Sequence, residues 1–142
     1  MSTFMALSAF FSLKDCPEAR EAIESLAAWL TDQFDFEYSS ALNSRSGTID
    51  VEITGGSETS WSGATEIEER LKALYPWVVE PVTVESICDN EDYSFHIGTE
   101  SQCLRLESEQ TFRRVVEFSL PRLLDYHLRE LRQRIQQRLD QL

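Results

Sequence analysis

The chain begins with a strand-like pattern, and a helix-like pattern follows it. From Phe4 to Leu13, apolar or small side chains occupy both sets of alternating positions. This pattern is typical of a central strand that is covered on most of both faces. The next apolar residues recur every three or four positions after Pro17, which suits the first turn of a helix. We therefore expect a helix over about residues 17–33.

Two alternating segments follow this helix. Residues 36–42 and 49–54 place apolar side chains at every second position, and the Asn43–Gly47 segment between them is rich in turn-forming residues. The pattern predicts a hairpin in which each strand has one buried face and one wet face.

A stretch rich in glycine and serine, residues 55–63, predicts a loop before a second helix over about 63–75, which Pro76 ends. The loop displays Trp61 and precedes a helix, so it is a candidate binding loop. It lacks the lysine of a phosphate-binding loop, which leaves Trp61 as a protein-contact anchor. The alternative is a serine-capped helix start with Trp61 as a hydrophobic staple.

Two further strands are expected at residues 82–87 and 93–97, joined by an acidic turn at 89–92. With that turn, the residue numbers of two residues that pair across the hairpin add up to about 181. His96 is therefore expected opposite Glu85. Residues 103–106 are a candidate for another short edge strand.

The expected element order defines the fold class. The order β-α-β-β-α-β, followed by an extra strand and a long C-terminal helix, resembles the split βαβ, or ferredoxin-like, sandwich of the α+β class. This resemblance concerns topology alone, and many unrelated functions use that fold.

The C-terminal segment is helical from Ser108 onward, with an expected break at Pro121 and a second segment over about 121–141. The second segment has apolar residues at the spacing of a coiled-coil seam, namely Leu124, Leu128, Leu131 and Ile135. We expect an α+β core domain at 1–107 and a helical extension at 108–142. The extension either packs on the core or forms a homodimer.

Charge is divided unevenly along the chain. Of its 142 residues, the first hundred carry 19 acidic against 5 basic side chains, and the remainder carry 6 acidic against 8 arginines, for a total of −12. An acidic body disfavours direct binding to nucleic acid or to anionic membranes, because both are negatively charged. It favours a partner protein with a basic surface.

The chemistry-bearing residues predict no metal, no cofactor and no catalytic site. Cys88 or Cys103 with His96 is a conceivable thiolate pair, but strand cysteines are usually small buried apolar residues. The acidic turn at 89–92 lacks the central glycine and the distal glutamate of a calcium loop. The cysteines are odd in number and widely spaced, which is typical of reduced thiols. With no basic leader of a signal peptide, we expect a cytoplasmic protein.

These observations favour a non-catalytic acidic protein, of the inhibitor, immunity or adaptor type, that occupies a surface on another protein. Its expected partner-binding residues are an aromatic anchor and exposed carboxylates, namely Trp61, Glu58, Glu66, Glu69, Asp50 and Glu52.

Two alternatives remain open. The first is a nucleic-acid mimic, of the phage or mobile-element counter-defence type, that inhibits a DNA- or RNA-binding protein. It predicts a row of carboxylates at phosphate-like spacing, with Glu66, Glu69, Asp50 and Glu52 as members. The second is a small-ligand-binding or enzymatic ferredoxin-like domain, which requires a pocket near His96 or the cysteines.

Overall fold

The computed structural model describes residues 2–142 and divides into two units, Met1–Leu104 and Arg105–Leu142. Unit 1 contains a five-stranded antiparallel sheet, and the described residues as a whole form four α-helices, which gives an α+β class. The secondary-structure elements of unit 2 are all helical.

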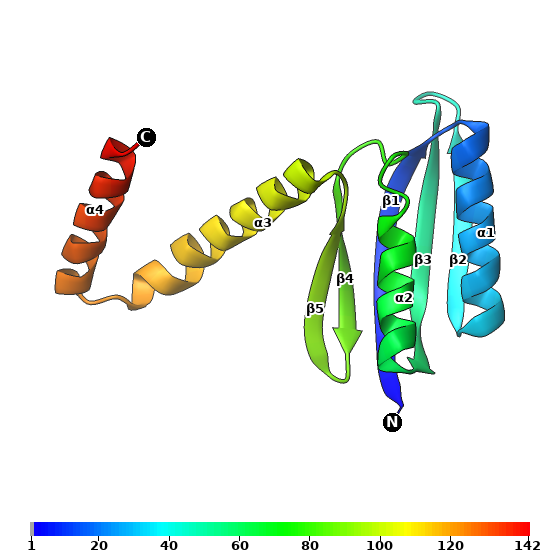
Figure 1. Cartoon of the computed structure of the whole chain (residues 1–142), viewed down its shortest axis with the longest axis horizontal. Coiled ribbons are helices and arrows are strands. Elements are labelled where there is room, and N and C mark those ends of the chain that lie inside the picture. Colours follow the sequence, from blue (N-terminus) through cyan, green and yellow to red (C-terminus); the bar gives the residue numbers. More distant parts are fainter. Residues whose placement is uncertain (1) are drawn as a thin grey trace. The chain divides into compact units, whose positions relative to one another are not determined.

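The sheet of unit 1 has the strand order β2-β3-β1-β4-β5 (Figure 1). Its central strand pairs with β3 along its whole length and with β4 over Met5–Ser8. The strands are β1 (Thr3–Lys14), β2 (Phe36–Asn43), β3 (Thr48–Thr59), β4 (Val82–Cys88) and β5 (Glu91–Ile97).

Two helices, α1 (Pro17–Gln33) and α2 (Trp61–Lys72), lie on the same face of this sheet (Figure 1). The bounds expected for the first helix are confirmed. The second begins two residues earlier than expected, because the Ser60 hydroxyl caps it by accepting a hydrogen bond from the Gly63 amide at 3.0 Å.

The hydrophobic core lies between the sheet and these helices. It takes the odd-numbered side chains of β1, every second residue of β3 and the inner stripe of each helix, as alternation and helical periodicity require. Its largest fully buried apolar residues are Leu13, Ile23, Leu30, Ile53, Ile67, Leu71, Val84 and Ile97.

The central strand is buried on one face only, so the expectation of cover on both faces is wrong. The odd-numbered residues of β1 are buried, whereas Phe4 and Phe10 on the other face are 48% and 59% exposed. The reason is that α1 and α2 both pack on the side of the odd-numbered residues.

The glycines at 55 and 56 lie within β3 and not in a loop. The strand continues to Thr59 because β1 supplies a pairing partner for each of its residues. A side chain at Gly55 would place its Cβ 2.7 Å from the Asp35 carbonyl oxygen, and one at Gly56 would meet the ring of Phe4 at 2.6 Å. These glycines therefore permit close approaches inside a strand.

The β4–β5 hairpin turns on two residues, Asp89 and Asn90, which adopt φ values of 50° and 68°. Positive φ at both central positions is the signature of a tight hairpin turn. The shorter turn shifts the register, so His96 pairs with Thr83, and the expectation that it faces Glu85 is wrong.

Residues 103–106 belong to helix α3 (Glu100–Arg114), so the expected edge strand is wrong. Thr99 and Gln102 form a capping box that starts the helix here. The Gln102 side-chain oxygen accepts a hydrogen bond from the Thr99 amide at 2.8 Å, and the Thr99 hydroxyl accepts one from the Gln102 amide at 3.3 Å.

The C-terminal helical segment is interrupted, as expected, around Pro121. After α3 the chain passes through a π-helical turn, Val115–Ser119, and a 3₁₀ turn, Leu120–Arg122, before α4 (Asp125–Asp140). Neither α3 nor α4 contains a buried residue. Within residues 2–142, no helix has both the length and the apolar content to cross a bilayer.

We expect Gly55→Ala to destabilise unit 1 more than Gly47→Ala, by at least about 2 kcal/mol. Both glycines have positive φ, 137° and 64°, but a side chain at Gly47 meets nothing within 4 Å, whereas one at Gly55 meets the Asp35 backbone. Urea unfolding followed by tryptophan fluorescence measures the difference, because all tryptophans lie in unit 1. Equal losses for the two variants would contradict this account of Gly55.

Candidate functional site

The candidate site is the face of the sheet that α1 and α2 leave uncovered, here called the open face. It comprises the even-numbered residues of β1 and the residues that flank them in register. Directly paired residues of an antiparallel ladder point to the same side, so Phe10 shares the open face with Glu52, and Phe4 shares it with Glu58.

Carboxylates dominate the charge of the open face. Among the described strands, a single basic side chain lies on this face, that of Lys14 at the end of β1. The exposed acidic residues of this face come from four strands and are Glu37, Asp50, Glu52, Glu58, Glu85 and Asp92.

These carboxylates have no cationic partners in the described part of the chain. The ion pairs of unit 1 lie elsewhere: Arg20 pairs with Asp15 beside α1, while Arg70 and Lys72 pair with glutamates on α2. On the open face, Asp50 accepts a hydrogen bond from the Ser12 hydroxyl at 2.7 Å, which orients the carboxylate without neutralising it. The open face therefore carries a net negative charge.

Exposed apolar side chains lie among the carboxylates. Phe4, Phe10 and Ile87 leave between 44% and 59% of their surface in water. Between β1 and β4 lies a shallow hollow of about 300 Å³ whose lining includes Ile87, Glu85 and Asp92. Apolar groups ringed by polar residues are typical of protein-interaction surfaces.

The ring of Phe4 is held in place by its surroundings. Its backbone amide donates to the Asp89 carboxylate at 2.9 Å, and the Asp89 amide donates to the Phe4 carbonyl at 3.0 Å. The side chain lies over Gly56, where the missing Cβ makes room for it. The backbone of Phe4 is thus fixed to the β4–β5 turn, and its exposed ring rests on Gly56 of β3.

The sequence-predicted partner-binding residues divide between two layers. Asp50, Glu52 and Glu58 lie on the open face, whereas Glu66 and Glu69 are exposed on α2, on the other side of the sheet. The structure therefore brings together the first three but not all five.

The α2 side differs from the open face in its electrostatics. Glu66 pairs with Arg70 at 2.8 Å, and that guanidinium lies 4.1 Å from the centre of the Trp29 ring. Trp61 begins α2 and is 62% exposed, so its interpretation as a packed staple is wrong, while the Ser60 cap is confirmed.

The sequence does not indicate Phe4 and Phe10 as site residues, because the pattern of β1 predicts cover on both faces. It also does not indicate the acidic residues of β2, β4 and β5, namely Glu37, Glu85 and Asp92. The signal was present in the alternation itself. Ser8 and Ser12 occupy the same set of positions as the two phenylalanines, and serines at every other position favour a face in contact with water.

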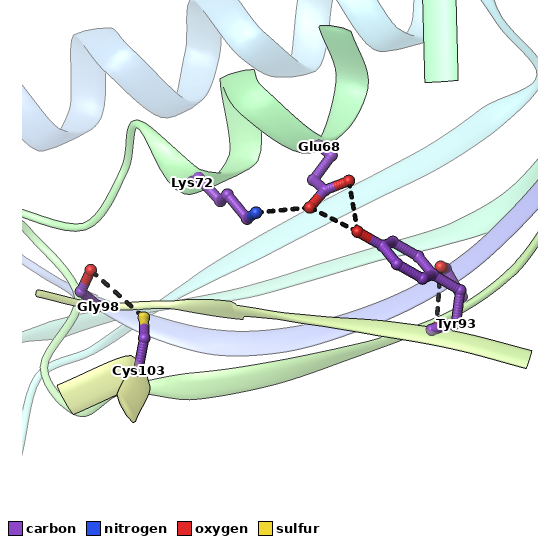
Figure 2. Close-up of polar contacts among 6 residues, drawn as sticks. Glu68, Lys72, Tyr93, Gly98 and Cys103 are labelled. Carbon is purple, nitrogen blue, oxygen red and sulfur yellow. Dashed lines mark hydrogen bonds and ion pairs between the residues drawn. The ribbon is translucent and has the colours of Figure 1, made fainter. Parts of the chain in front are cut away.

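The structure separates Cys88 from His96, so these two residues form no thiolate–imidazolium pair. Cys88 lies on the helix side of β4 and His96 on the opposite face, where Nδ1 of His96 contacts the Thr83 hydroxyl at 3.0 Å. Burial, followed by the charges of Asp89 and Glu91, raises the pKa of the Cys88 thiol and so disfavours its thiolate. Cys103 donates to the Gly98 carbonyl at 3.7 Å (Figure 2).

Other hollows and acidic groups offer little convergent chemistry. A hollow of about 660 Å³ at the start of α1 is lined by Cys16, but the neighbouring Asp15 and Arg20 pair with each other at 2.6 Å. Within residues 2–142, no cluster of three histidine, cysteine or acidic side chains is arranged to hold a metal ion.

A polar clamp joins β5 to α2 (Figure 2). The Tyr93 hydroxyl donates to the Glu68 carboxylate, with both oxygens 2.9 Å away, and Lys72 pairs with the same carboxylate at 2.5 Å. Burial, together with the Glu68 hydrogen bond, raises the pKa of Tyr93 to about 12. The clamp fixes the outer strand of the sheet, and so the edge of the open face.

Comparison of the chain with protein-family models, with curated proteins and with solved structures finds no match.

We expect Tyr93→Phe to remove part of the alkaline sensitivity of unit 1. A tyrosine with a raised pKa favours the folded state below the unfolded value near 10, and this contribution is lost as pH rises towards about 12. Unfolding by urea at pH values from neutral to 11 should show a steeper loss of stability in the parent than in Tyr93→Phe. Parallel pH profiles would contradict the clamp.

Proposed function

We propose that this chain is a non-catalytic binding protein whose open face occupies a basic surface on another protein. The observation that carries the proposal is a sheet face on which exposed phenylalanines are surrounded by carboxylates without cationic partners. The exposed rings favour contact with another apolar surface, and the carboxylates around them are complementary to a positively charged protein.

The proposal includes a ferredoxin-like core. The order β2-β3-β1-β4, the antiparallel pairing and the two helices on one face support this assignment. In such a two-layer sandwich, the face opposite the helices is available for contacts, and β5 extends it by one strand.

The mixture of groups favours a protein over a polyanion as partner. Phe4 and Phe10 can fill apolar pockets and supply most of the affinity, because large buried anchors dominate protein interfaces. The surrounding carboxylates would steer a basic partner and set its orientation. The same carboxylates repel phosphates, whether of nucleic acid or of a membrane. An inhibitor, immunity or adaptor protein acts in this manner. Cysteines present as thiols fit a cytoplasmic setting.

The two alternatives have weaker support. A nucleic-acid mimic would need its carboxylates in one row, yet Asp50 and Glu52 lie on the open face while Glu66 and Glu69 lie on α2. An enzyme or small-ligand domain would need a pocket near His96 or the cysteines with polar groups converging on it. Cys88 lies across the sheet from His96, and in the hollow lined by Cys16 the charged groups Asp15 and Arg20 pair with each other.

The test uses the full chain as bait in lysate of its native host, with two matched variants. Phe10→Ser removes an anchor of the open face, and Trp61→Ser removes a similarly exposed aromatic residue from the helix side. We expect a partner of micromolar affinity or tighter, weakened at least about tenfold by Phe10→Ser and by less than about twofold by Trp61→Ser. Titration with the purified partner, followed calorimetrically, measures both changes.

Two variants that each remove one negative charge give a second, independent comparison. We expect Glu52→Gln to slow association and to reduce its salt dependence, because Glu52 lies on the open face, whereas Glu69→Gln, on α2 on the other side of the sheet, should change both much less. Recovery of no partner, or greater sensitivity to Trp61→Ser than to Phe10→Ser, would overturn the assignment of the open face.

A further inference from the structure

The outer edge of β2 has no strand beside it (Figure 1). This strand lies at one end of the sheet and pairs with β3 through all of its eight residues, from Phe36↔Gly55 to Asn43↔Thr48. An edge strand directs the amide and carbonyl groups of every second residue away from the sheet. Within residues 2–142, no hydrogen bond satisfies the outward backbone groups of residues 37–42. Those groups can pair with another extended segment.

The edge of β2 lacks the features that usually prevent the addition of a strand. Edge strands are commonly protected by lysine, by proline, by a bulge or by a charge that points inward. The segment Phe36–Asn43 contains no lysine and no proline, and its unbroken register with β3 leaves no bulge. Its one charged residue, Glu37, points to the open face and away from the helices. The edge is therefore accessible to a further strand.

The opposite edge of the sheet, at β5, is covered more fully on its helix side. There Phe95 and Ile97 are buried, and Tyr93 is hydrogen-bonded to α2. On the helix side of β2, Phe36 is buried, but Leu42 is 59% exposed. The helix layer thus reaches over β5 and leaves the second half of β2 uncovered, so β2 is the edge with room for further side chains.

A hollow of about 360 Å³ lies on the helix side of β2, next to the first half of α1. Its apolar lining comes from Ile23 of α1, from Tyr38 and Leu42 of β2 and from Ile49 of β3. The side chains of a strand added to β2 would alternate between the two faces, so every second one would point into this hollow. The hollow therefore favours apolar side chains at alternate positions of the added strand.

The charges on the other face favour basic side chains at the remaining positions. These positions lie next to Glu37 on the open-face side of β2. The short residues Ser39 and Ala41 separate the edge from Glu52 and Asp50 of β3, with which they pair. None of these three carboxylates forms an ion pair in the part of the chain that the structure describes.

Two charged residues line the hollow itself. Arg20 pairs with Asp15 at 2.6 Å, so its charge is neutralised locally. Glu24 forms no ion pair with any described residue. The helix side of the edge therefore adds a further carboxylate that attracts a basic segment.

A second copy of this chain fits the edge of β2 poorly. The described strands contain one lysine or arginine, Lys14, so none of them alternates apolar with basic side chains. Residues 1–100 carry 19 acidic against 5 basic side chains, and two such bodies repel each other. The charge of the edge thus favours a different, basic chain.

We propose that the edge of β2 binds an extended segment of another protein in which apolar and basic side chains alternate. The backbone of the segment pairs with the outward groups of β2, its apolar side chains enter the hollow beside α1, and its basic side chains lie near Glu37. In complexes of this kind, main-chain hydrogen bonds supply affinity and side-chain pockets supply specificity. The inference does not rest on the proposed function, because β3 separates this edge from Phe4 and Phe10 of β1.

Peptides test the three requirements of the edge separately. The probe is a peptide of alternating valine and lysine with blocked ends, as long as the eight residues of β2, titrated into the full chain and followed by NMR. We expect a dissociation constant of about 10–300 μM. Binding should weaken at least about tenfold when glutamate replaces lysine, when serine replaces valine, or when every backbone nitrogen is methylated. No binding of the probe at about 1 mM, or equal binding of any of the three controls, overturns the proposal.

Matched variants of the chain locate the bound peptide. Leu42→Ser removes part of the lining of the hollow, and Ile87→Ser makes a comparable change on the open face, at side chains that are 59% and 44% exposed. We expect Leu42→Ser to weaken binding of the probe at least about fivefold and Ile87→Ser less than about twofold. Greater sensitivity to Ile87→Ser places the probe on the open face and overturns the assignment to β2, without contradicting the proposed function.

Amide hydrogen exchange tests the addition of a strand directly. In the complex, the outward amides among residues 37–43 should exchange at least about threefold more slowly than in the free chain. The inward amides of the same strand, which already pair with β3, should change little. A bound probe that leaves the exchange of the outward amides unchanged overturns the added strand.

Discussion

The structure of unit 1 depends on the pairing of β1 with β3, which runs without interruption from Thr3↔Thr59 to Lys14↔Thr48. Because side chains alternate along a strand, this register assigns each residue of the two longest strands to the core or to the open face. A slip of one residue would expose the core set and bury Phe10 with Glu52. Burial of one set against α1 and α2 is what specifies the register.

The charge of unit 1 follows from the same one-sided architecture. Carboxylates are expensive to bury without partners, and both the open face and the outer sides of the helices leave them in water. On α2, Glu66 pairs with Arg70 and Glu68 pairs with Lys72, whereas Asp50 and Glu52 on the open face have no such cation. The open face also exposes Phe4 and Phe10.

Unit 2 obeys a different constraint, because helices without buried residues cannot be held by a core of their own. Several of its large apolar residues, among them Phe112, Phe118 and Leu124, are exposed.

Much of the architecture could be predicted from the chain alone. Local patterns determined α1, the β2–β3 hairpin, the interruption near Pro121 and the α4 seam, because each depends on near-neighbour chemistry: a proline, a turn or a spacing of apolar residues. The long-range facts were decided only by tertiary structure. Which face of β1 stays open depends on where α1 and α2 pack. Gly55 and Gly56 extend β3 because β1 is long enough to pair with them. The two-residue turn at Asp89 and Asn90 decides which residue pairs with His96. Periodicity shows that a strand has two faces, but only the packing of distant segments decides which face meets water.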